Sequence, residues 1–206
     1  LSEYFVKTAK ELGAEIVFEK KFPLGEREFR AMLAQVKLKN PDLIWATGYY
    51  GEAAAIASQA RELGIEATIL GQEGYDSPKF IELAGEAAEG VIIVTDLNRD
   101  SDREIVQKFL AEYEKRAGHP ADMVAASAFD AVKVAAHAIA VAGTDAEAIA
   151  KAINDIRHMY DVVTGPFYAF LGREAIRPVE VQIVREGAFR FFHTFTEPEI
   201  IIPPEL

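Results

Sequence analysis

The sequence predicts an α/β protein in which a parallel sheet is flanked by helices. Helical and strand-like patterns alternate from residue 1 to residue 95, which is the order of βαβ units. Two apolar segments, 43–47 and 67–70, each lead into a glycine-containing loop, and a helical run from Ala53 to Leu63 connects them. Strands connected in this way are parallel, so their carboxyl ends share one edge of the sheet.

The elements of this first part follow from apolar spacing and from glycine and proline stops. Gly13 and Gly64 each end a helix, because glycine adopts the left-handed conformation at little cost. Asn40-Pro41 ends another helix. We expect helices over 1–12, 26–39, 53–63 and 78–84, and strands over 14–18, 43–47, 67–70 and 91–95.

The pattern changes after residue 95, where a polar connector over 96–102 precedes three helices, at 103–117, 123–142 and 146–156. The helix over 123–142 is apolar nearly all round, which predicts burial between layers, with His137 packed inside. Strands are expected over 166–170, 179–184 and 189–195, the last two joined by a hairpin turn at Glu186-Gly187. An apolar, proline-stopped tail, 200–204, follows.

Composition limits the class of partner. The 206 residues include 22 basic and 33 acidic side chains, for a net charge of −11, which disfavours nucleic acid and anionic lipid as partners. There is no cysteine, so disulfides and thiolate metal sites are excluded. No apolar run is expected to reach the ~20 residues that span a bilayer. The chain begins at Leu1 without Met or a basic-then-apolar leader, so we expect a processed or truncated piece whose signal peptide has been removed.

The motifs of the common cofactor-dependent and hydrolytic enzymes are missing from the sequence. No GxGxxG follows a strand, and neither GxxxxGK[ST] nor GxSxG occurs. The four histidines, at 119, 137, 158 and 193, form no HxxxH pair, so no metal site is predicted. We therefore expect no enzyme activity and no cofactor.

Two polar side chains follow neighbouring strands of the predicted sheet. Tyr49 comes after the strand over 43–47, and Glu73 comes after the strand over 67–70. In open α/β sheets this edge is where small ligands bind. A carboxylate can accept hydrogen bonds from a ligand ammonium group, and a tyrosine ring can present its face to the same cation. Tyr49 and Glu73 are the main ligand-binding candidates, with Tyr50, Gln72, Tyr75 and Asp76 as weaker ones.

Several segments together resemble the leucine/isoleucine/valine-type periplasmic binding proteins of amino-acid ABC transporters, and the resemblance covers nearly the whole chain. They are Gly48-Tyr49-Tyr50-Gly51-Glu52, Gln59 to Gly64, Gly71-Gln72-Glu73-Gly74, Ala84 to Gly90, Asp130-Ala131-Val132 and Thr164-Gly165-Pro166-Phe167.

The resemblance implies a type I Venus-flytrap protein of two lobes that closes on a free amino acid, branched-chain or otherwise hydrophobic, and delivers it to a transporter permease. The family's ligand contacts carry over onto Tyr49 and Glu73. Residues 1–95 and 179–198 would form the second lobe, and residues 96–178 the hinge crossing and the helices of an incomplete first lobe. The protein would be periplasmic or extracellular, either free or lipid-anchored in its full-length form.

The first half of the family's chain has no counterpart here. The helices over 103–157 would therefore need a cover, which could be the missing N-terminal segment, a partner copy, or the second lobe after refolding. Two other function classes remain open. One is a ligand-sensing domain of a receptor or amide regulator with the same fold, and the other is a flavodoxin-like enzyme, for which no nucleophile and base pair is found.

Overall fold

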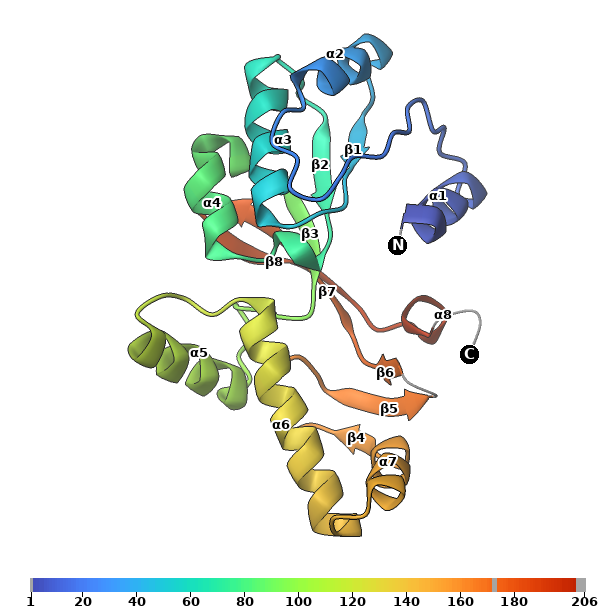
Figure 1. Ribbon diagram of the computed structural model, residues 1–206, viewed down its shortest axis with the longest axis vertical. Coiled ribbons are helices and arrows are strands. Elements are labelled where there is room, and N and C mark those ends of the chain that lie inside the picture. The colour runs from blue at the N-terminus through green and yellow to red at the C-terminus, as the bar shows by residue number, and fades with distance from the viewer. Residues whose placement is uncertain (1, 172–173, 203–206) are drawn as a thin grey trace. The chain divides into compact units, whose positions relative to one another are not determined.

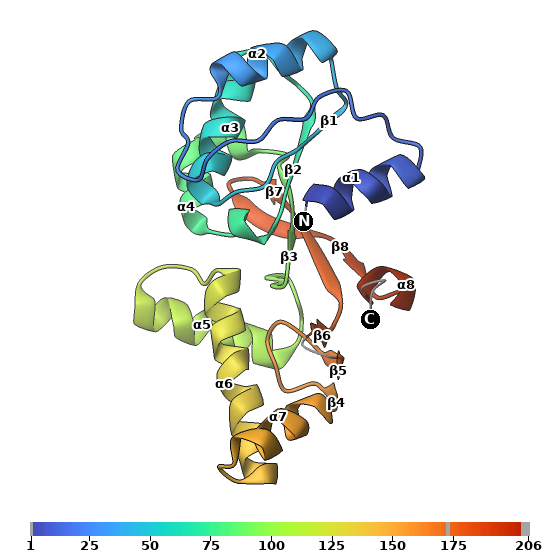
Figure 2. The same ribbon diagram turned by 45° about the vertical axis from the view of Figure 1, so that its right-hand side comes forward.

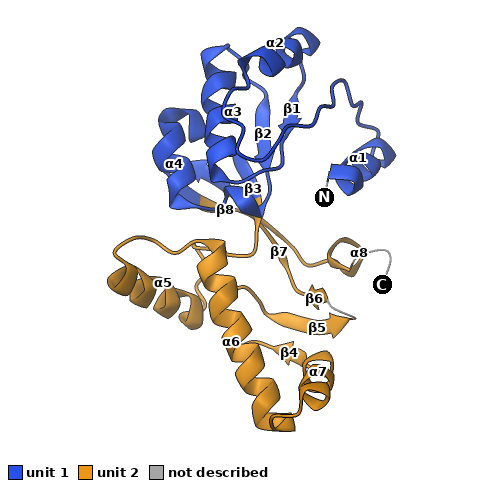
Figure 3. Cartoon of the chain, viewed as in Figure 1, with its two compact units in different colours: residues 1–93, 183–189 blue, residues 94–182, 190–206 orange. Residues whose placement is uncertain are grey.

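The computed structural model describes residues 2–171 and 174–202, so Leu1, Pro203 and Pro204 of the predicted terminal segments lie outside the described residues. The chain divides into two compact units (Figure 3). Unit 1 comprises Leu1–Ile93 and Ile183–Phe189, and unit 2 comprises Val94–Gln182 and Arg190–Leu206. The chain therefore passes between the units three times. The assignment of residue ranges to two lobes stays a prediction.

A five-stranded sheet has the order β1-β2-β3-β7-β8, with strands Leu43–Trp45, Thr68–Gly71, Ile92–Thr95, Val179–Arg185 and Ala188–Phe195. The first three strands are parallel, with Leu43 opposite Thr68 and Leu70 opposite Ile92. Helices lie between them in the chain, as βαβ units require. The predicted α/β class with a parallel sheet flanked by helices is confirmed, and the later strands extend this sheet.

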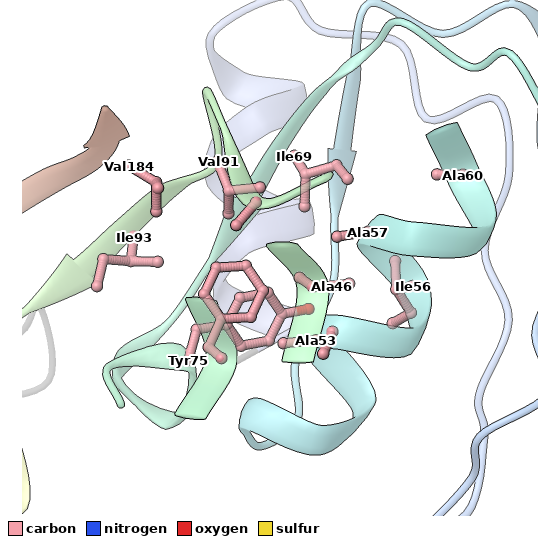
Figure 4. Close-up of a cluster of buried hydrophobic side chains, with 14 of the residues drawn as sticks. Ala46, Ala53, Ile56, Ala57, Ala60, Ile69, Tyr75, Val91, Ile93 and Val184 are labelled. Carbon is pink, nitrogen blue, oxygen red and sulfur yellow. The ribbon is translucent and has the colours of Figure 1, made fainter. Parts of the chain in front are cut away.

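Figures 1 and 2 show α3 and α4 on one side of the strands of unit 1, and α1 on the other side. The face of α3 that carries Ala53, Ala57 and Ala60 is fully buried, and its small side chains let it pack closely against the strands (Figure 4). On the other side, Phe5 of α1 stacks on Trp45 of β1 with ring centroids 4.5 Å apart. These helices are α1 (Ser2–Glu11), α2 (Arg30–Lys39), α3 (Tyr50–Glu62) and α4 (Pro78–Ala84), with 3₁₀ helices η1 (Glu73–Tyr75) and η2 (Gly85–Ala88).

Two predictions for the first thirty residues are wrong. Residues 14–18 form no strand, and β1, at the edge of the sheet, pairs only with β2. The helix predicted from residue 26 begins at Arg30. The residues just before Arg30 are bonded to a side chain of α3 instead. Gln59 accepts a hydrogen bond from the Phe29 N–H at 2.6 Å and donates one to the Arg27 carbonyl at 2.7 Å.

The predicted hairpin turn is present between β7 and β8. Glu186 and Gly187 have φ values of 54° and 69°, as a two-residue type I′ turn requires. The Glu89 carboxylate accepts hydrogen bonds from the N–H groups of both turn residues, at 3.0 and 2.6 Å. One residue further, Gly90 donates its N–H to the Val184 carbonyl. A segment that the sequence marked only as a family motif thus holds the hairpin.

Unit 2 contains the three predicted helices and a second sheet. The helices α5, α6 and α7 span Glu104–Ala117, Met123–Ala142 and Ala146–Asn154. The antiparallel sheet β4-β5-β6 consists of Arg157–Met159, Phe167–Leu171 and Glu174–Ile176. Only β5 was expected, since the outer strands have three residues each, too few for a periodic pattern. A short helix α8, Pro198–Ile201, follows β8.

The expectation that the helix over 123–142 is buried all round is wrong for this chain. One stripe of α6, Ala126, Asp130, Val134 and Ala138, is buried, whereas Val124, Val132 and Val141 are more than 60% exposed. His137 is exposed as well. By length and composition α6 could cross a membrane, contrary to the expectation that no run would. Its buried stripe nevertheless packs within unit 2, as in a core helix.

The buried stripe of α6 carries a carboxylate that anchors the segment before β5. Asp130 is 1% exposed and accepts hydrogen bonds from the Val163 N–H, at 2.7 Å, and from the Thr164 N–H and hydroxyl, at 2.6 and 2.8 Å. From the start of α5, the Arg103 guanidinium donates to backbone carbonyls of the same segment, including Val162 and Gly165 at 2.6 Å. Two of the family motifs are therefore bonded to each other.

Candidate functional site

Two loops at the carboxyl ends of parallel strands carry the predicted ligand-binding residues. The first leaves β1 and reaches Tyr49, which precedes the first residue of α3 in extended conformation. The second leaves β2 and reaches Glu73, the first residue of η1. Because β1 and β2 are neighbours in the sheet, both loops lie at the same edge.

The two loops are in direct contact. Gln72 donates a hydrogen bond from Nε2 to the Gly48 carbonyl at 2.8 Å. A methyl group added at Gly74 would lie 2.2 Å from the same carbonyl oxygen, which no side chain can tolerate. The backbones therefore meet at Gly48 and Gly74, the chain neighbours of Tyr49 and Glu73. The structure brings the two main candidates to adjoining positions.

The side chains of the main candidates point into solvent. Tyr49 is 59% exposed and Tyr50 is 44% exposed, and Glu73 is exposed too. Within the described part of the chain, the Glu73 carboxylate makes no hydrogen bond and no ion pair. A free carboxylate beside exposed aromatic rings can accept hydrogen bonds from an incoming cation.

The weaker candidates are held more firmly by the protein. Gln72 is half-buried, and its amide nitrogen is engaged by the Gly48 carbonyl. Tyr75 is completely buried in the core of unit 1 (Figure 4). Its ring packs against Gly71, and burial raises the pKa of its hydroxyl. Asp76 is buried as well. Of these three side chains, Gln72 connects the two loops.

Sequence reasoning missed Glu52, which organises the Tyr49 loop. It is 2% exposed and accepts hydrogen bonds from the Gly25 N–H at 2.7 Å and the Tyr49 N–H at 3.2 Å. Burial acts to raise the pKa of this carboxyl, but the backbone hydrogen bonds outweigh it and the pKa is lowered. The spacing is that of a capping box, yet the residue at the cap is Tyr rather than the usual Ser or Thr, so the signal was not recognised.

Among the described residues, no three His, Asp or Glu side chains lie close enough together to bind a metal ion. Two grooves lie away from the Tyr49 and Glu73 loops. One, of about 600 Å³, is in unit 2 and is lined by residues of α6, α7 and β4, among them His137, Lys151 and His158. The other, of about 400 Å³, is at the opposite ends of the unit 1 strands, near Lys37 and Asp42.

Comparison with known proteins gives consistent matches. The model of a family described as "Periplasmic binding protein" matches residues 1–188. A Leu/Ile/Val-binding protein of Citrobacter freundii is 30% identical over 112 residues, which are 53% of this chain and 30% of the relative. A Pseudomonas aeruginosa protein named for binding leucine, isoleucine, valine, threonine and alanine is 26% identical over 149 residues, 71% of this chain and 39% of the relative.

Solved structures agree in fold. A leucine binding protein from Thermotoga maritima superposes with a TM-score of 0.88 at 33% identity, over 97% of this chain and 57% of that one. A branched-chain amino acid transporter substrate-binding protein from Streptococcus pneumoniae, solved with isoleucine, gives 0.80 at 26% identity over 91% and 54%. The chain thus spans about half the length of these solved relatives, and less of the curated ones.

Proposed function

Because this chain belongs to the periplasmic binding protein family, we propose that it forms part of an extracytoplasmic solute-binding protein of an ABC transporter. Its ligand is a free hydrophobic amino acid, which the protein delivers to a membrane permease. The relatives named for leucine, isoleucine and valine support this class of ligand. No enzymatic step is part of the proposal.

The observation that carries the proposal is the free Glu73 carboxylate beside Tyr49 on two loops in contact. A zwitterionic amino acid needs an acceptor for its ammonium group, and a carboxylate provides charge-assisted hydrogen bonds. Glu73 accepts these bonds in the proposal, and the ring of Tyr49 covers the cation. Tyr50 lies next to it and contributes apolar contact.

The apolar face of unit 2 belongs to the same proposal. On α6, Val124, Phe129, Val132, Ile139 and Val141 are 40% exposed or more. Exposed apolar area of this extent indicates an interaction surface. The solved relatives contain additional chain beyond the part matched here, and a segment of this kind covers α6 in the proposal. A second copy of the chain would be the alternative cover, and sedimentation would reveal it as a dimer.

The test is a fusion protein in which the unmatched part of the Thermotoga maritima relative precedes this chain. Replacing Glu73 by Ala in that fusion should weaken leucine binding by roughly 1.5–3 kcal/mol, the range for a hydrogen bond to a charged group. Titration calorimetry measures the change, and Glu66→Ala, an exposed carboxylate outside the two loops, serves as control. Unchanged affinity in the Glu73 variant would remove that residue from the site.

The 206-residue chain alone should bind poorly. A ligand enclosed on one side keeps its ammonium contacts but loses the contacts to its carboxylate and the exclusion of water. Losing ~4 kcal/mol would weaken a micromolar site to about millimolar. We expect no saturable leucine, isoleucine, valine or phenylalanine binding below about 100 µM. Micromolar binding by calorimetry would show that the site is complete by another route, such as a dimer.

A further inference from the structure

We propose that Gln72 and Glu52 are positioning residues of the ammonium site: they fix the Tyr49 and Glu73 loops against each other without contacting the ligand. This inference rests on the proposed function, since it assigns roles within the same site. The loops that carry Tyr49 and Glu73 are separated by the whole of α3, so local sequence alone cannot set their relative position. The pairing of β1 with β2 brings both loops to one edge of the sheet, and side chains that bridge the loops fix their spacing there.

Gln72 supplies the bridge between the two loops. Its Nε2 donates to the Gly48 carbonyl at 2.8 Å, directly before Tyr49 in the chain. The absence of a side chain at Gly74 is what permits this approach, because a Cβ there would lie 2.2 Å from the Gly48 oxygen and 2.8 Å from Gln72 Nε2. The bond fixes the spacing of the loops on either side of the contact.

Glu52 fixes the Tyr49 loop from the side of α3. Its two carboxylate oxygens accept from the N–H groups of Tyr49 and Gly25, so one buried side chain holds the cap residue and the preceding coil segment together. The Arg27 guanidinium lies 3.4 Å from the carboxylate and packs over Gly51, where a Cβ would lie 2.5 Å from its nitrogen. The backbone of Tyr49 is thereby held in one conformation.

The two pairs of side chains differ in what they contact, and this difference supports the assignment. Side chains that point to solvent, Tyr49 and Glu73, have no hydrogen bond to another described side chain. Side chains beneath them, Glu52 and Gln72, use their polar atoms on loop backbone. A ligand group that reaches this surface meets the first pair and not the second.

The experiment uses the 206-residue chain and two millimolar-range probes followed by NMR. L-Leucinamide carries an ammonium group, and 4-methylpentanamide is the same molecule without it. Leucinamide should shift the amide signals of Tyr49 and Glu73, and 4-methylpentanamide should not. Gln72→Ala and Glu52→Gln should each weaken leucinamide binding roughly 2- to 10-fold, because each removes one hydrogen bond that holds the loops in place.

A matched control separates positioning from general destabilisation. Gln59→Ala removes two hydrogen bonds that α3 makes to the same coil segment, at Arg27 and Phe29, and touches neither candidate loop. It should speed amide exchange at Phe29 and leave the leucinamide response unchanged. Glu52→Gln should instead speed amide exchange at Tyr49 and Gly25, by roughly 10-fold or more.

Three outcomes decide the matter. Weakened leucinamide binding in both positioning variants, with normal binding in the Gln59 variant, supports the assignment. Binding in both positioning variants equal to wild type overturns it and leaves the proposed function intact. A wild-type chain with no leucinamide response overturns the ammonium site and this inference together, and is recognised before any variant is compared. If Glu52→Gln fails to fold, Gln72→Ala carries the test, since it truncates only a half-buried side chain.

Discussion

Replacing Asp130 by Ala should destabilise unit 2 more than any other single truncation of a polar side chain on α6. The carboxylate is buried and accepts three hydrogen bonds from residues 163 and 164, all between 2.6 and 2.8 Å. The variant loses these charge-assisted bonds and leaves the buried N–H groups of Val163 and Thr164 without an acceptor. The Thr164 hydroxyl still has Arg177, which donates to it at 2.7 Å.

The magnitude follows from breaking a buried charged network. Each hydrogen bond to a charged group is worth about 1.5–3 kcal/mol, but bonds to one carboxylate are not additive. Leaving a buried donor without an acceptor costs about 1–3 kcal/mol. Asp130→Ala leaves two such N–H groups, so we expect a loss of about 2–5 kcal/mol. Asp130→Asn keeps one acceptor oxygen, so it should cost less, roughly 1–3 kcal/mol.

Urea unfolding followed by circular dichroism measures the change in unfolding free energy. Asp122→Ala is the matched control on the same helix: its carboxylate caps α6 through a single hydrogen bond from the Ala125 N–H at 2.8 Å. Loss of that cap should cost about 0.5–2 kcal/mol. If Asp130→Ala costs no more than Asp122→Ala, the buried network does not stabilise the segment before β5, and the reasoning is refuted.

Three further predictions concern stability. Tyr75→Phe removes a buried hydroxyl without a partner among the described residues, so its melting temperature should be unchanged or higher; a clear drop would reveal a bonded hydroxyl. Glu89→Ala should cost about 1 kcal/mol and speed amide exchange at Glu186 and Gly187; unaltered exchange would contradict the bonds seen there. Burial raises the pKa of Glu180, so this carboxyl binds more protons in the folded than in the unfolded protein. The contribution of Glu180 to the free energy of unfolding should therefore fall as pH rises from 4.5 to the pKa of the folded state. Glu180→Gln should abolish that fall, and an identical pH profile of urea midpoints would argue against it.

Local patterns in the sequence were sufficient for most of the elements. Alternating apolar segments with glycine and proline stops predicted α3, α4 and the three parallel strands within a few residues. The turn at Glu186-Gly187 was predicted from its two residues, because their positive φ angles are a local property. Tyr49 and Glu73 were also placed at one edge, since the βαβ order fixes where parallel strands end.

The failures occurred where a distant contact overrides the local signal. The segment over 14–18 has a strand pattern but joins no sheet. The helix predicted from residue 26 is shortened because Gln59, some thirty residues away, holds Phe29. The apolar helix α6 predicts burial, and only the structure shows which of its faces is covered within this chain.

The sequence alone predicts the class of fold, the βαβ order of its first ninety-five residues and the two exposed side chains of the candidate site. How those side chains are held follows from the tertiary structure alone. Glu52, Gln72 and Gly74 act across contacts between segments that no local periodicity relates, and Asp130 and Glu89 each bond backbone more than thirty residues away. Secondary structure depends mainly on neighbours in the chain, whereas a site depends on hydrogen bonds and close approaches between loops, which exist only after the chain has folded.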